Sequence, residues 1–101
     1  MATGSNAVKE PKNEERTKHA PMYKVLIHND DVTTFGFVIG LLVIIFKKEV
    51  QEAVEIADEA HKKDVALVTV MPLELAELRV DQAHSKARAM KYPLTFTYEP
   101  E

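Results

Sequence analysis

The chain has 101 residues, of which 46% are hydrophobic, and its formal net charge at pH 7 is −3. This length favours a single domain with a small core. The acidic balance argues against a nucleic-acid-binding surface, which usually carries a basic patch. Since the chain contains no cysteine, disulfides and thiolate metal sites are excluded.

Residues 1–21 are polar and charged, and they contain few large apolar side chains. They bury too little apolar surface to offset their conformational entropy, so we expect a mobile N-terminal extension. The folded domain should then comprise residues 22–101. The start of the chain has no apolar segment of the secretory-signal type, which fits a cytoplasmic protein.

The first predicted elements are a strand and a helix joined by a polar corner. Apolar and polar side chains alternate along 22–28, which predicts the strand. Asn29, Asp30 and Asp31 follow with side chains that favour turns. Thr33 or Thr34 should be the N-cap of the helix, which we expect to run to about Lys47.

The first helix is almost entirely apolar from 35 to 46, with Gly36 and Gly40 at a GxxxG spacing. A membrane span needs about 20 residues, so this segment is too short to cross a bilayer. We predict a buried helix in which the two glycines allow close backbone packing.

Two further helices and two further strands complete the predicted order. A helix over about 49–63 carries an apolar stripe of Val50, Ala53, Val54, Ala57, Ala60 and His61. A strand covers 65–71, and Pro72 then begins a third helix whose apolar face holds Ala76, Val80, Ala83, Ala87 and Met90, widened by Leu75 and Leu78. The last strand covers 94–98.

The order β-α-α-β-α-β predicts an α+β fold. Three amphipathic helices can cover one face of a three-stranded antiparallel sheet, which gives a two-layer sandwich.

The sequence offers little for catalysis. Ser5 and Ser85 have no nucleophile context, and there is no phosphate-binding or dinucleotide-binding glycine motif. We therefore expect no enzyme activity, no cofactor and no metal. One alternative stays open, a metal site made of His28, His61 and either Asp30 or Asp31.

The corner at 29–31 suits a cationic ligand. An ammonium group has three donors, and Asn29, Asp30 and Asp31 offer amide and carboxylate oxygens beside an apolar helix. His61 places a polar tip at the end of an apolar stripe, where it could complete the site. The alternatives are an ordinary turn with charge at a helix start, and a boundary histidine.

From Tyr23 to about Glu99 the chain resembles ClpS, the bacterial adaptor family that delivers N-degron substrates to an AAA+ protease. The resemblance rests on YKVLIHNDD with Thr33 after it, on a second helix ending near His61, on ELAE at 74–77 and on the closing Pro93-Leu94.

The resemblance implies a site for the first residue of a protein substrate. Its α-amino group would be held by Asn29, Asp30, Asp31 and His61, and its Leu, Phe, Tyr or Trp side chain would enter a pocket lined by Ile27, Thr33, Phe35, Val38, Ala57, Ala60 and Leu94. Glu74 and Arg79 match positions that dock the adaptor on the N-terminal domain of the Clp unfoldase. The N-terminal extension would engage the unfoldase during delivery.

Several residues depart from the family pattern. Phe35 stands where Met is common, Ala57 and Ala60 replace larger apolar residues, and Asp64 replaces a glycine. The alternative is therefore a ClpS-like paralogue whose N-degron specificity is altered or lost and which acts as a protein-protein docking module. Because the first helix is apolar on all sides, we also expect self-association through Val43 and Ile44.

Overall fold

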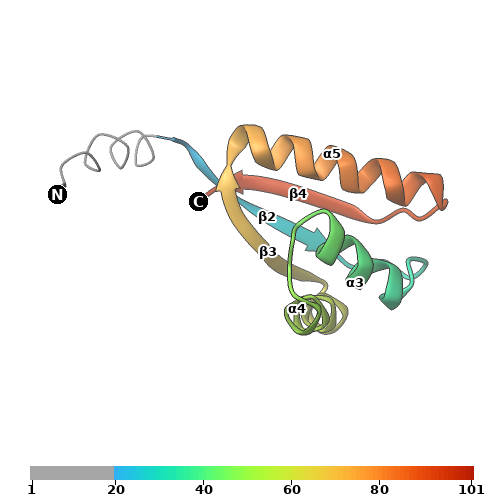
Figure 1. Cartoon of the computed structure of the whole chain (residues 1–101). Coiled ribbons are helices and arrows are strands. Elements are labelled where there is room, and N and C mark those ends of the chain that lie inside the picture. Colours follow the sequence, from blue (N-terminus) through green and yellow to red (C-terminus); the bar gives the residue numbers. More distant parts are fainter. Residues whose placement is uncertain (1–19) are drawn as a thin grey trace, which may run out of the picture.

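The computed structural model describes residues 20–101, so the expected extension at 1–21 lies almost wholly outside the described part. The elements are β2 (Met22–His28), α3 (Phe35–Ile44), α4 (Val50–Lys63), β3 (Val65–Pro72), α5 (Leu73–Ala89) and β4 (Thr95–Pro100) (Figure 1). This is the predicted β-α-α-β-α-β order. Among residues 20–101, no helix is long and apolar enough to cross a membrane.

The sheet places β2 between β3 and β4, and both pairings are antiparallel. The predicted three-stranded antiparallel sheet is thus confirmed. The register between β2 and β3 shifts after Val25, which pairs with Thr69 while Leu26 pairs with Leu67, so Val68 forms a bulge. Side chains of one face are buried, among them Val25, Ile27, Ala66, Val68 and Phe96.

Helix α3 starts as predicted but ends earlier. Thr34 is the N-cap, and its hydroxyl accepts a hydrogen bond from the Phe37 N–H at 3.2 Å. The prediction that the helix reaches Lys47 is wrong, because Lys47 adopts a left-handed conformation with φ of 60°. The Lys48 N–H then donates to the Leu42 carbonyl at 3.1 Å, which closes the helix end.

The two glycines of α3 do not serve close packing. A Cβ built on Gly36 or Gly40 would meet no atom within 4 Å, so both positions face open space. The expectation of close backbone contact was therefore wrong. The helix instead packs through Val38, Leu41 and Leu42.

Helices α4 and α5 pack through narrow faces of small residues. The buried positions of α4 are Ala53, Ile56, Ala57 and Ala60, and those of α5 are Ala76, Val80, Ala83 and Ala87. The α5 list confirms most of the predicted face. Several larger apolar side chains predicted for the two stripes are exposed instead: Val50, Val54, Leu75, Leu78 and Met90.

Candidate functional site

The corner after β2 is held together by the Asp30 carboxylate. Its Oδ1 accepts hydrogen bonds from the backbone N–H groups of Val32 and Thr33 at 2.8 and 2.7 Å, and its Oδ2 accepts from the Thr33 hydroxyl at 2.8 Å. A short polar side chain that bonds to the backbone two and three residues ahead favours a tight turn. Thr33 therefore locks the corner, which leaves Thr34 to cap α3.

These contacts also set the charge of Asp30. Partial burial opposes ionisation, but the hydrogen bonds from Thr33 and Val32 and the positive charge of Arg88 outweigh it and hold the pKa below its ordinary value near 3.8. Asp30 is therefore a carboxylate at neutral pH, and it adds negative charge to the corner.

The end of α4 is tied directly to this corner. Asp64 follows the helix in a left-handed conformation with φ of 73°, and its N–H donates to the Ala60 carbonyl at 2.8 Å. The chain then reverses, and the Asp64 carbonyl accepts from the Asn29 N–H at 2.9 Å. This bond joins the last turn of α4, where His61 lies, to the end of β2.

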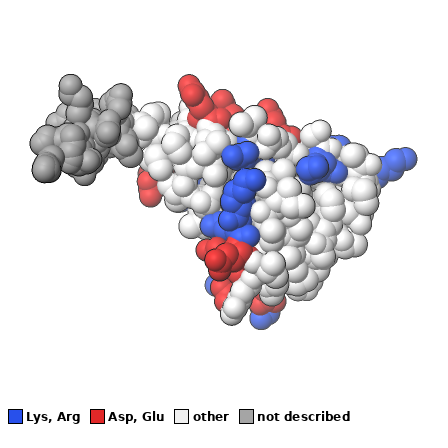
Figure 2. Space-filling view, in the orientation of Figure 1, with Lys and Arg blue, Asp and Glu red and all other residues white. Residues whose placement is uncertain are grey.

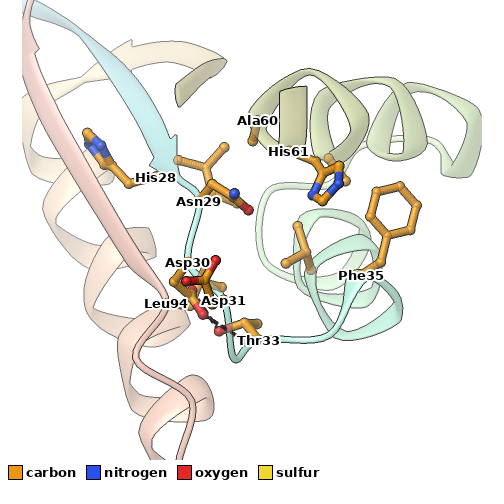
Figure 3. A pocket seen from close by; sticks show the side chains of 12 residues that line it. His28, Asn29, Asp30, Asp31, Thr33, Phe35, Ala60, His61 and Leu94 are labelled. Atoms are coloured by element: carbon orange, nitrogen blue, oxygen red, sulfur yellow. Dashed lines mark hydrogen bonds between the residues drawn. The ribbon is translucent and has the colours of Figure 1, made fainter. Parts of the chain in front are cut away.

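A pocket of about 410 Å³ opens between the corner, α3 and α4. All residues predicted for the amine site and the apolar pocket line it: Ile27, Asn29, Asp30, Asp31, Thr33, Phe35, Val38, Ala57, Ala60, His61 and Leu94. Figure 3 shows Asn29 and His61 reaching the same space from the end of β2 and from α4. Their roles in binding stay a prediction.

The pocket has an apolar interior and a polar mouth. Ile27, Ala57, Ala60 and Leu94 are all at most 4% exposed, and the exposed side chains of Asn29, Asp31 and His61 surround the opening. Phe35 lies at the same opening and is 46% exposed. The pocket can therefore hold an apolar group of a ligand, while hydrogen-bond donors next to that group contact the polar side chains around the opening.

The geometry argues against the alternative metal site. His28 is the one lining residue that was not predicted for the amine site or the apolar pocket, and Figure 3 shows its side chain pointing away from the pocket. Its Nε2 lies 2.7 Å from the Thr97 hydroxyl on the other face of the sheet. Within residues 20–101, no three His, Asp or Glu side chains gather in a way that would hold a metal ion.

The two expected docking residues lie on α5, away from this pocket. Glu74 is exposed in the first turn, and Arg79 is half-buried with its Nη1 donating to Gln82 Oε1 at 3.3 Å. Arg79 also lines a second, open pocket together with Ile44, Lys47 and Lys86. Figure 2 shows Lys and Arg side chains near the centre of the displayed face of the molecule, beside a broad uncharged surface.

The fold and the pocket define a small α+β recognition domain. The family described as "ATP-dependent Clp protease adaptor protein ClpS" matches residues 18–97. The ATP-dependent Clp protease adapter protein ClpS of Desulfatibacillum aliphaticivorans is 41% identical over 87 residues, which cover 86% of this chain and 84% of that protein. The corresponding protein of Nautilia profundicola is 40% identical over 78 residues, covering 77% and 80%.

A solved structure is similar as well. The structure of Agrobacterium tumefaciens ClpS2 bound to L-phenylalaninamide matches with a TM-score of 0.79 and 31% identity, covering 82% of this chain and all of that one. The chain therefore belongs to the ClpS family. As a member of this family it is an adaptor of the ATP-dependent Clp protease and is not itself an enzyme.

Sequence reasoning did not identify two residues that lie outside the pocket lining but act on the residues of the site, Asp64 and Arg88. The Asn29–Asp64 hydrogen bond joins residues far apart in the chain, and the charge of Arg88, on α5, acts on Asp30 in the corner. The only sequence signal was Asp64, which stands where the resemblance to ClpS implies a glycine.

Proposed function

We propose that the chain binds the free α-amino group and the apolar first side chain of N-degron substrates and delivers them to an AAA+ Clp unfoldase. One observation carries the proposal: an apolar pocket whose mouth is surrounded by Asn29, Asp30, Asp31 and His61. A substrate N-terminus has a cation and a side chain on the same carbon atom, so both halves of the site can be used at once.

The chemistry of this mouth would select true N-termini. An ammonium group needs up to three acceptors, which the amide oxygen of Asn29, the Asp30 carboxylate and an imidazole nitrogen of His61 can supply. An internal peptide bond has a single N–H and no charge, so it would leave the acceptors unpaired. Support comes from the similar ClpS2 structure, whose ligand L-phenylalaninamide carries a free amino group and a benzyl side chain.

The pocket interior would set which first residue is preferred. Its volume of about 410 Å³ and its small wall residues Ala57 and Ala60 leave room for Leu, Phe, Tyr or Trp side chains. Phe35, partly exposed at the opening, can lie against a bound side chain. Loss of a methylene from such a wall changes discrimination by only about 1–3 kcal/mol. The departures from the family pattern would therefore shift the preference and leave amine recognition intact.

Delivery would use other parts of the chain. We propose that Glu74 and Arg79 dock the recognition domain, residues 22–101, on the N-terminal domain of the unfoldase. The extension at 1–21 would engage the unfoldase as it takes the substrate. A partner of an ATP-dependent protease must work where ATP is present, which supports a cytoplasmic location.

The test is fluorescence anisotropy with short labelled peptides that begin with Leu, Phe, Tyr or Trp, each compared with its N-acetylated form. We expect binding that acetylation abolishes. His61→Ala should weaken it by about tenfold, because one hydrogen bond to a charged group is lost. Lys62→Ala is the matched control, because it is an exposed change next to His61 on α4 and outside the pocket lining, and it should bind like the wild type.

Absence of binding to all four peptides would refute this function. It would favour the second candidate, a paralogue that keeps the docking face and has lost N-degron specificity.

We also propose self-association through Val43 and Ile44. Ile44 is 61% exposed at the end of an apolar helix, and the surface around α3 in Figure 2 is largely uncharged. Analytical ultracentrifugation of the wild type and of Ile44→Lys tests this. A wild type that remains monomeric at high concentration would refute it.

A further inference from the structure

One wall of the pocket is held in place by helix α5. After α5 ends at Ala89, Lys91 turns the chain in a left-handed conformation with φ of 63°, and the Tyr92 N–H donates back to the Ala87 carbonyl at 2.9 Å. The segment 92–96 then runs along the helix, and its last two residues, Thr95 and Phe96, begin β4. Leu94, in the middle of this segment, is 1% exposed and lines the pocket.

A single side chain reaches both ends of this turn. Arg88 Nη1 donates to the carbonyl oxygens of Tyr92 and Leu94, each at 2.8 Å. Further on, the Phe96 N–H donates to His84 Nε2 at 2.9 Å. Segment 92–96 is therefore bound to α5 on both sides of Leu94. Two of the four hydrogen bonds, counting that from the Tyr92 N–H to the Ala87 carbonyl, come from the Arg88 guanidinium.

The Arg88 bonds are of a kind that fixes geometry. Hydrogen bonds from an ionised donor are shorter and about twice as strong as neutral ones. The guanidinium is planar and always charged, so its two bonds hold the carbonyls at a set distance from the helix. Arg88 also lies near enough to Asp30 for its positive charge to help lower the pKa of that carboxyl group.

We propose that Arg88 is a positioning residue for the pocket. It holds Leu94 as a fixed wall and thereby sets how strongly the pocket selects a bulky first side chain. Arg88 does not line the pocket, so it acts through Leu94 rather than on the ligand. The expected effect on selectivity rests on the proposed function, whereas the position of Leu94 rests on the hydrogen bonds of Arg88.

The first test needs no ligand. In methyl-labelled Arg88→Gln protein, the Leu94 methyl resonances should shift and the Leu94 methyl order parameters should fall. The reason is that the shorter Gln side-chain amide cannot reach the carbonyls of both Tyr92 and Leu94. Arg88→Lys keeps the charge on a shorter side chain and should give an intermediate effect. Lys86→Gln, an exposed change in the same turn of α5, is the matched control and should leave the Leu94 signals unchanged.

The second test measures selectivity. For each variant, the Kd of a peptide beginning with Ala is divided by the Kd of the same peptide beginning with Phe, both with free amino groups. This ratio should fall about fivefold to tenfold in Arg88→Gln and less in Arg88→Lys, because a loosened wall loses contact with the bulky side chain only. A purely structural role would lower the melting temperature and leave the ratio unchanged.

The outcomes are separable. If the wild type binds no peptide, the proposed function fails, and the methyl spectra alone decide the role of Arg88. The proposal would be overturned if both Arg88 variants gave the wild-type methyl spectra. It would also be overturned if the wild type bound the peptides and the ratio of Kd values were the same in the Arg88 variants as in the wild type. If Arg88→Gln does not fold, Arg88→Lys decides by the same two measurements.

Discussion

Asp30 provides the sharpest test of how the corner after β2 is built. Its carboxylate accepts three hydrogen bonds, from the Val32 N–H, the Thr33 N–H and the Thr33 hydroxyl. Removing a side-chain cap of this kind costs about 0.5–2 kcal/mol, and hydrogen bonds to charged groups are worth about 1.5–3 kcal/mol when buried. Water can reach this corner, so we expect Asp30→Ala to lower the free energy of unfolding by about 1–2 kcal/mol.

The assay is urea denaturation together with thermal melting. In a domain of this length, each kcal/mol lost from the free energy of unfolding should lower the melting temperature by about 4–8 °C. Asp30→Asn keeps an acceptor oxygen and should lose less. Asp31→Ala is the matched control: it is the neighbouring carboxylate, exposed and outside these hydrogen bonds, and it should change stability by less than about 0.5 kcal/mol.

The pH dependence adds an independent check on Asp30. Because its folded-state pKa lies below the ordinary value near 3.8, its contribution is complete above that value and is lost as the pH falls through the lower folded-state pKa. Asp30→Asn should lack this part of the acid-induced loss. Equal stabilities of Asp30→Ala and Asp31→Ala would refute the reasoning.

Three further predictions concern other parts of the fold. Asp64→Gly should stabilise the protein by up to about 1 kcal/mol in urea denaturation, because Asp64 has a left-handed backbone, whereas Glu55→Gly inside α4 should destabilise it by a similar amount. His84 accepts a hydrogen bond from the Phe96 N–H. Burial, and then the charge of Arg88, lower the pKa of His84 below 6.5, although Asp81 acts in the opposite direction. The contribution of His84 to the free energy of unfolding is therefore complete above pH 6.5 and is lost as the pH falls through the lowered pKa. His84→Gln should flatten that slope of unfolding free energy against pH, and an unchanged slope would contradict the assignment. Ala60→Met should reduce peptide affinity for a first Trp relative to a first Leu by about tenfold in anisotropy, and equal losses for both would show that the wall does not select by size.

Local patterns were enough to predict the order of the elements. Alternation along 22–28 and the helical spacing of Ala76, Val80, Ala83 and Ala87 depend only on the period of each element. The corner at 29–31 follows from side chains that bond to their own backbone. The residues of the pocket came from the resemblance to ClpS, since no local pattern relates Ala57 and Ala60 to Ile27 or Leu94.

The errors lie where an element meets its neighbours. The predicted apolar stripe of α4 includes Val50 and Val54, but both are exposed and Ile56 is buried in their place. The reason is that the elements packed against α4 determine which side of its apolar stripe is buried. In the same way, Gly36 and Gly40 suggested a close contact that the packing of α3 does not make.

The site as a whole exists only in the folded chain. The Asp64 carbonyl meets the Asn29 N–H and brings the end of α4 to the end of β2, and Arg88 holds Leu94 from a third helix. The Asn29–Asp64 bond joins residues far apart in the chain, so no local pattern predicts it, and it forms only when α4 lies against the end of β2. The chemistry of the corner was therefore readable from its residues, whereas its combination with an apolar pocket was decided by tertiary structure.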